Sequence, residues 1–118
     1  MSNDIIDLEE VMERVQNDQE LFFELLAIFQ DDYEVKRRLL NELIALKDFE
    51  QLRNVAHSLK GASSNISAKK VYACFAQLEN VAEQKEGAQV PGILANIDKQ
   101  YAALQITIEK LKKELKKF

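Results

Sequence analysis

Residues 49–66, with the sequence FEQLRNVAHSLKGASSNI, carry a regular helical pattern in the middle of the chain. The positions of its inward side recur at alternating steps of three and four residues: Phe49, Leu52, Ala56, Leu59, Ser63 and Ile66. This spacing places them along one side of an α-helix and is typical of a helix inside a bundle. Asp48, with Gln51 three residues later, resembles a capping box, so we expect the helix to begin near Phe49.

Similar periodicity on both sides of this stretch predicts four more helices. A short helix is expected at about 7–15, and a long one capped by Asp18 should reach about Lys47. Ser67 is predicted to cap a helix that runs to about Gln84, and Pro91 is expected as the first residue of the last helix. The pattern predicts an all-α fold, an up-and-down four-helix bundle with a short N-terminal helix as a lid over one end.

Composition is consistent with one helical domain over residues 1–118. The chain has one Pro and three Gly, and a net charge of −4 argues weakly against nucleic acid as its main partner. The lysines of 110–117 are interpreted as a solvated helix end. Nothing resembles a signal peptide or a membrane span, so we expect a cytoplasmic protein without a membrane partner. Its single Cys and single His do not suggest a metal site.

His57 is the chain's only histidine, and it lies off the apolar side of its helix. Residues of an α-helix advance by roughly 100° each, which turns His57 about 140° from the inward side and toward solvent. Lys60 can swing its ammonium alongside the imidazole, a pairing that suits an anion between the two. Gly61 faces the same way, although glycine inside a helix costs about 1 kcal/mol relative to alanine. We interpret Gly61 as leaving room for a partner that approaches His57.

With these residues in place, the segment resembles the histidine-containing phosphotransfer (HPt) domain of two-component phosphorelays. The family pattern is matched by Ala56, His57, Leu59, Lys60, Gly61, Ala62, Ser63, Asn65, Ile66 and Ala68. The pair Leu78-Glu79 also looks like the family's ending of the following helix. One position departs, because Ser67 stands where the family usually has Gly.

The resemblance implies that His57 accepts a phosphoryl group from an aspartyl phosphate on a receiver domain and passes it to another receiver. Lys60 would help to neutralise the phosphate, and Gly61 would leave space for docking. The implied partners are response-regulator receiver domains and a hybrid sensor kinase. Magnesium would come with the receiver, so no cofactor is expected on this chain, which we expect to be a monomer. Either imidazole nitrogen could be the acceptor.

The histidine face and an apolar patch beside it are predicted to dock the receiver. The candidate docking residues are Arg53, Asn54, Ser58, Ser64, Leu8, Val11, Met12, Leu21 and Leu25. The alternative is a non-catalytic helical adaptor that binds a signalling partner through the face of Arg53, Lys60 and Ser64. Neither a Ser-His-Asp set nor a glycine-rich nucleotide loop is recognisable, so we expect neither a hydrolase nor autokinase activity.

Overall fold

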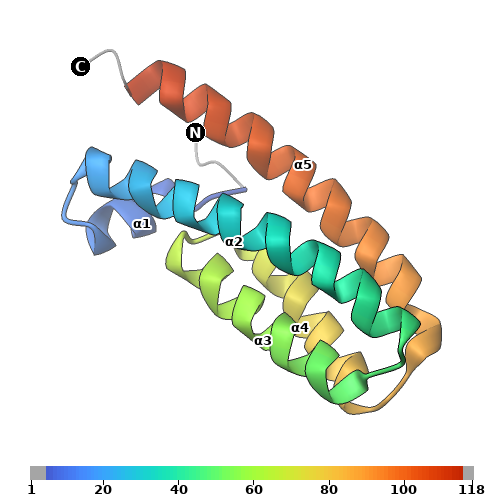
Figure 1. The fold of residues 1–118 in the computed structure, drawn as a ribbon. Helices are drawn as coiled ribbons and strands as arrows, with labels where there is room; N and C mark the ends of the chain where they lie inside the picture. Colours follow the sequence, from blue (N-terminus) through green and yellow to red (C-terminus); the bar gives the residue numbers. More distant parts are fainter. Residues whose placement is uncertain (1–4, 116–118) are drawn as a thin grey trace.

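A computed structural model describes residues 5–115, and residues 1–4 and 116–118 lie outside the described part (Figure 1). The helices are α1 (Leu8–Arg14), α2 (Gln19–Ala45), α3 (Phe49–Asn65), α4 (Lys69–Glu83) and α5 (Val90–Leu115), with a short 3₁₀ helix η1 (Gly87–Gln89) before α5. Of the predicted solvated helix end, Lys116 and Lys117 therefore lie outside the described residues.

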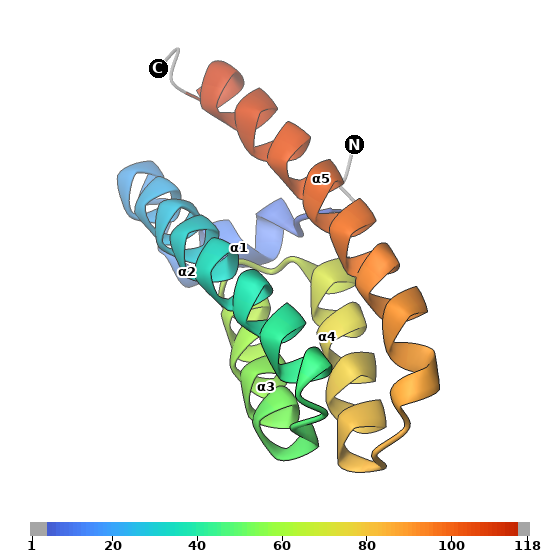
Figure 2. The same cartoon turned by 45° about the vertical axis from the view of Figure 1, so that its right-hand side comes forward.

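The four helices α2 to α5 run up and down beside one another, joined by short connections (Figure 2). The longest, α2 and α5, have 27 and 26 residues and extend past the ends of α3 and α4 (Figure 1). This arrangement confirms the predicted four-helix bundle. It also leaves one end of the α3–α4 pair to be covered by another element.

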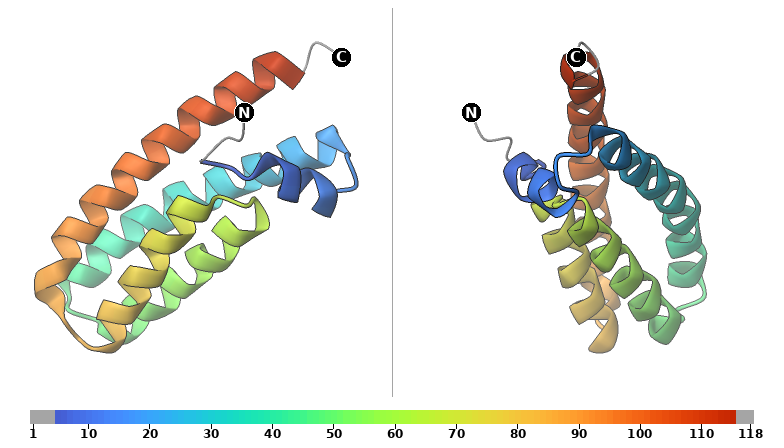
Figure 3. Two further views of the ribbon diagram at one scale, coloured as in Figure 1. Left: turned by 180° about the vertical axis from the view of Figure 1, so that it is seen from behind. Right: turned by 90° about the vertical axis from the view of Figure 1, so that its left-hand side faces the viewer.

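The helix α1 lies across that end (Figure 3). Its packing side is apolar, and Ile6, Val11 and Val15 are buried in the common core. The backbone amide of Asp7 donates to the carbonyl of Ser67, a bond of 2.9 Å that ties the start of α1 to the α3–α4 connection. The predicted lid is thus confirmed, and its position is set by both apolar packing and a backbone hydrogen bond.

The inward sides of the helices follow the predicted periodicity. On α3, the side chains of Leu52, Ala56, Leu59 and Ser63 are buried, and the Ser63 hydroxyl is satisfied by donating to the carbonyl of Leu59 at 2.7 Å. On α4, the buried residues are Val71, Cys74, Phe75, Leu78, Val81 and Ala82. On α2, Leu26 is fully buried and Leu25 is half-buried, which leaves part of the Leu25 side chain at the surface.

The predicted caps at Asp18 and Asp48 are confirmed, and Asp7 caps α1 in the same way. Asp7, Asp18 and Asp48 each accept a hydrogen bond from the amide three residues later, at 3.0–3.1 Å. The end of α2 lies two residues before Lys47, which adopts a left-handed backbone with φ 56°. Pro91 lies in the first turn of α5 rather than at its first residue, because the helix begins at Val90 after η1.

The prediction that Ser67 caps α4 is wrong. Ala68 is the N-cap residue of α4, and no side chain supplies a capping bond there. Ser67 instead ends α3: it has φ 55°, its amide donates to the carbonyl of Ser64, and the next amide donates to that of Ser63. This left-handed position after a helix favours glycine, so Ser67 occupies a backbone conformation that costs less for Gly than for other residues.

Candidate functional site

The site is built on the outer side of α3. Because the buried side of α3 faces the bundle, His57 on the other side has 67% of its side chain exposed. The cap at Asp48 and the tight turn at Ser67 fix both ends of the helix. The imidazole is therefore presented to solvent from a rigid element, as the helical pattern predicted.

The carboxylate of Glu79 on α4 contacts both functional side chains of α3. Its Oε2 lies 2.8 Å from Nδ1 of His57, and its Oε1 lies 2.7 Å from Nζ of Lys60. The anion between His57 and Lys60 that the sequence suggested is thus supplied by the protein itself in the free state. Glu79 is largely covered, with 18% of its side chain exposed, so the contact is partly shielded from water.

This contact assigns the hydrogen on the imidazole. An ionised carboxylate only accepts hydrogen bonds, so Nδ1 of His57 must donate to Glu79. In the neutral ring the lone pair is then on Nε2, which has no partner among the hydrogen bonds of the described residues. The geometry points to Nε2 as the free nucleophilic atom of His57.

The pKa shifts of Glu79 and Lys60 support an ionised Glu79 carboxylate. The bond from Lys60 lowers the pKa of Glu79, and the bond from His57 lowers it further, whereas partial burial acts in the opposite direction. In return, Glu79 raises the pKa of Lys60. At neutral pH Glu79 is therefore an anion and Lys60 a cation, and the ammonium is held beside the imidazole.

Gly61 has no packing partner that would exclude a side chain. A Cβ built at this position has no other heavy atom within 4 Å, apart from its chain neighbours and the backbone of its own helix. Close helix packing therefore does not explain this glycine. The residue faces solvent on the same side as His57, as the sequence predicted.

A groove between α2 and α3 lies next to this face. It has a volume of about 170 Å³ and is lined by Leu25, Ile28, Phe29, Asp32, Ala62, Asn65 and Ile66. Three apolar side chains at seven-residue spacing, Leu21, Ile28 and Val35, are 39%, 64% and 61% exposed. Seven residues are nearly two turns, so the three lie in one row along α2. They form an apolar strip that we call the α2 strip.

The predicted docking residues divide according to exposure. Asn54, Ser58 and Ser64 are exposed on α3 and Arg53 is half-buried, whereas Leu21 is exposed and Leu25 half-buried beside the groove. Leu8 and Met12 are half-buried and pack against the core. Val11 is wrongly assigned to docking, because α1 turns it fully into the core.

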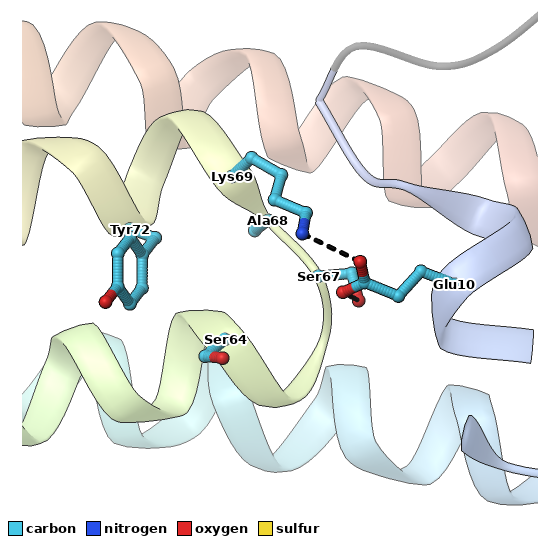
Figure 4. A pocket seen from close by; sticks show the side chains of 6 residues that line it. All are labelled: Glu10, Ser64, Ser67, Ala68, Lys69 and Tyr72. Carbon is cyan, nitrogen blue, oxygen red and sulfur yellow. Dashed lines mark hydrogen bonds and ion pairs between the residues drawn. The ribbon is translucent and has the colours of Figure 1, made fainter. Parts of the chain in front are cut away.

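A second, smaller pocket of about 100 Å³ lies between α1 and the α3–α4 connection (Figure 4). Glu10 enters from α1 and forms a 2.8 Å ion pair with Lys69 at the start of α4. Glu10 also accepts a hydrogen bond from Ser67 at 2.8 Å. Among the described residues that line this pocket, the charged side chains of Glu10 and Lys69 are paired with each other, and the pair links α1 to the bundle.

Sequence reasoning missed three features of the site. It noted Glu79 only as part of a family pattern, and it did not identify Ile28 or Val35 as exposed apolar residues. It also did not identify the contact between Lys36 on α2 and Ser58, whose Oγ lies 2.7 Å from Nζ. The seven-residue spacing of the α2 strip is the one signal that was visible in the sequence.

Among residues 5–115, no cluster of three or more His, Cys, Asp or Glu side chains is placed to bind a metal ion. Within the same range, no helix combines the length and apolar character needed to cross a membrane. The observed site consists of one exposed imidazole, one carboxylate and nearby ammonium groups.

Comparisons with known proteins agree with this geometry. The family model of the Hpt domain matches residues 24–114, which include all of α3 and α4. The crystal structure of histidine-containing phosphotransfer protein B from Pseudomonas aeruginosa superposes with a TM-score of 0.83 at 27% identity, covering 93% of this chain and 96% of that one.

A histidine-containing phosphotransfer protein from Medicago truncatula has the same fold, with a TM-score of 0.79 at 21% identity and coverage of 96% of this chain and 82% of that one. Comparison with curated protein sequences gave no match. The family match covers most of the chain, and the solved structures share its whole architecture. The chain therefore belongs to the Hpt domain family, and its role is that of a phosphorelay phosphocarrier.

Proposed function

We propose that Nε2 of His57 accepts a phosphoryl group from the aspartyl phosphate of one receiver domain and passes it on to the aspartate of another receiver domain. The observation that carries this proposal is the bond between Nδ1 and Glu79, which leaves Nε2 of an exposed imidazole free to attack. Phosphoryl transfer depends mainly on positioning and charge stabilisation, so a well-placed nucleophile is the main contribution required of a carrier.

The transfer balances without a proton leaving the site. Nε2 attacks phosphorus with its lone pair, the bond between phosphorus and the aspartate oxygen breaks, and the aspartate departs as a carboxylate. The ring becomes a phosphorylated imidazolium that still carries its hydrogen on Nδ1. Glu79, the acceptor of that hydrogen, stabilises the new positive charge. The reverse transfer uses the same steps in the opposite order.

Lys60 and Gly61 have supporting roles in this proposal. Glu79 holds the ammonium of Lys60 beside the imidazole, where it can contact a phosphoryl oxygen on Nε2. Gly61 faces the same solvent region and presents no side chain, which leaves the receiver's active site room to approach. Magnesium would belong to the receiver, and we assign no cofactor and no autokinase activity to this chain.

Hpt proteins work with two-component response regulators and kinases, and the α2 strip gives this chain a surface for such a partner. The strip and the groove behind it lie beside α3, so a receiver seated there would cover the His57 face. We propose docking through Leu21, Leu25 and Ile28, together with Asn54 and Ser64. The monomeric state and the cytoplasmic location stay predictions.

A two-step transfer experiment tests the proposal. The protein is mixed with a phosphorylated receiver, separated from it, and then mixed with a second, unphosphorylated receiver. A carrier gains a phosphate that is labile in acid and stable in base, and then loses it to the second receiver. An adaptor without covalent chemistry would bind the receiver and gain no phosphate, which would contradict the proposal.

A further inference from the structure

Lys36 of α2 reaches across to the helix that carries His57. Its Nζ lies 2.7 Å from Oγ of Ser58, the residue directly after His57, and 3.0 Å from Oδ2 of Asp32. Its side chain is 28% exposed, so the aliphatic part is covered while the ammonium reaches the surface. No role in the site described above accounts for this lysine.

Lys36 and Lys60 approach His57 from opposite sides. Around α3, Ser58 lies about 100° to one side of His57 and Lys60 about 60° to the other. Lys60 extends toward Glu79 on α4, whereas Lys36 comes from α2 and meets Ser58. Around α3, the position of His57 is therefore flanked by Lys60 on one side and, on the other, by Ser58 with the ammonium of Lys36 bound to it.

The two ammonium groups are held differently. Lys60 is paired with the carboxylate that also binds His57, so part of its charge is already neutralised. Lys36 is shared between a carboxylate and the neutral hydroxyl of Ser58, in a contact that is exposed to solvent. A phosphoryl oxygen is a stronger acceptor than a hydroxyl oxygen, because hydrogen bonds between ionised groups are stronger than bonds to neutral ones.

We propose that Lys36 is a second phosphate-neutralising residue, whose ammonium exchanges the hydroxyl of Ser58 for a phosphoryl oxygen when a phosphoryl group is transferred to or from His57. The inference rests on the proposed function. Phosphate brings two negative charges to a site where Glu79 already offsets Lys60. Lys36 is also paired with a carboxylate, and it brings a second ammonium to the phosphate while its bond to Asp32 is kept.

The test compares Lys36→Met with Arg38→Met in transfer from a phosphorylated receiver. Each substitution removes one positive charge from α2. Arg38 is exposed, and because it lies two residues after Lys36, it is rotated by about 200° around α2 and faces away from the Lys36 side. We expect Lys36→Met to slow transfer about fivefold, the order of one partly exposed charge contact, and to weaken its dependence on salt. Arg38→Met should leave the transfer rate and its salt dependence unchanged, and Lys36→Arg should retain most of the wild-type transfer rate.

Ser58→Ala separates this role from a structural one. If Lys36 acted by positioning Ser58, removing the hydroxyl would slow transfer as much as Lys36→Met does. Under the proposal, Ser58→Ala slows transfer clearly less than Lys36→Met does, because the ammonium stays in place and loses only its competing partner. Thermal melts check that each variant is folded, and Lys36→Gln, which keeps a donor but no charge, replaces Lys36→Met if that variant unfolds.

The inference would be overturned if Lys36→Met kept the wild-type transfer rate and salt dependence. It would also be overturned if Lys36→Met and Ser58→Ala lost the same fraction of the transfer rate. Neither result would affect the role of His57. That role is followed separately by labelling with phosphoramidate, a small donor, in the wild type and in His57→Gln. Label retained by His57→Gln would instead refute the proposed function itself.

Discussion

Glu79 of α4 fixes the imidazole of His57 on α3 through a 2.8 Å contact between its Oε2 and Nδ1. The two residues come from adjacent antiparallel helices, and the contact crosses the interface between them. It leaves Nε2 without a partner among the described residues and, under the proposed function, would stabilise the positive charge of a phosphorylated ring. One residue of the neighbouring helix thus orients the exposed imidazole.

Glu79→Ala should therefore slow phosphorylation of His57 about tenfold, the order of a charge-assisted hydrogen bond that is partly exposed to water. Glu79→Gln retains an oxygen that accepts from Nδ1, so its rate should lie between those of Glu79→Ala and the wild type. Labelling rates with a phosphorylated receiver measure both. Equal rates in Glu79→Ala and the wild type would show that the contact does not control the nucleophile.

Gly61 is expected to show opposite effects on stability and on transfer. Gly61→Ala should stabilise the fold by up to about 1 kcal/mol, because alanine favours the helix and nothing lies within 4 Å of the added Cβ. Gly61→Gln should also fold, but its side chain should slow transfer from a receiver steeply while labelling by phosphoramidate changes little.

Gly92→Gln is the matched control for Gly61→Gln. Gly92 lies in the first turn of α5 and also has open space around an added Cβ, so its substitution should leave transfer unchanged. Equal receiver transfer in Gly61→Gln and Gly92→Gln would refute the steric explanation for Gly61.

Ser67 combines an unfavourable backbone with favourable side-chain bonds. Its φ of 55° suits glycine, yet its hydroxyl donates to Glu10 at 2.8 Å and accepts from Arg14 at 3.2 Å. Ser67→Ala removes the hydrogen bonds to Glu10 and Arg14 but leaves a side chain on the left-handed backbone, so it should destabilise the protein by about 1 kcal/mol. Ser67→Gly should be more stable than Ser67→Ala by about 1 kcal/mol. Urea unfolding measures both, and the reverse order would contradict this account.

The contacts of Glu10 predict a loss of stability in acid. Bonds from Lys69, Ser67 and Arg14 lower the pKa of Glu10 from 4.5 to about 2. Because the folded-state pKa is depressed, this stabilisation is fully present above the unfolded-state pKa and is lost as pH falls toward about 2. Glu10→Gln should therefore have a lower melting temperature than the wild type at neutral pH. The difference between the two melting temperatures should become smaller as pH falls below about 4.5.

Glu13→Gln controls for the change of charge, since Glu13 is an exposed residue of the same helix. Its melting temperature should not show the narrowing expected of Glu10→Gln. A constant gap between Glu10→Gln and the wild type across the acid range would mean that these ion pairs do not hold α1 in place.

The sequence was sufficient to predict the helices and the outward position of His57, because both depend on periodicity along one helix. The sequence was not sufficient to predict the contacts of Glu79 with His57 and Lys60, or the contact between Lys36 and Ser58. These contacts depend on how the neighbouring helices are rotated against α3. The error at Ser67 has a different cause. Serine commonly caps helices, but the tight α3–α4 turn places it one residue too early and in a left-handed conformation.

Transfer from a phosphorylated receiver to the wild type and to His57→Gln tests the central claim most directly. The substitution removes the imidazole from an exposed position, where changes usually cost less than about 0.5 kcal/mol, so the helical circular dichroism and melting temperature should be nearly unchanged. Intact-mass measurement should find one phosphoryl group on the wild type and none on His57→Gln. A folded His57→Gln protein that still gains the phosphoryl group would contradict the assignment of His57 as the carrier residue.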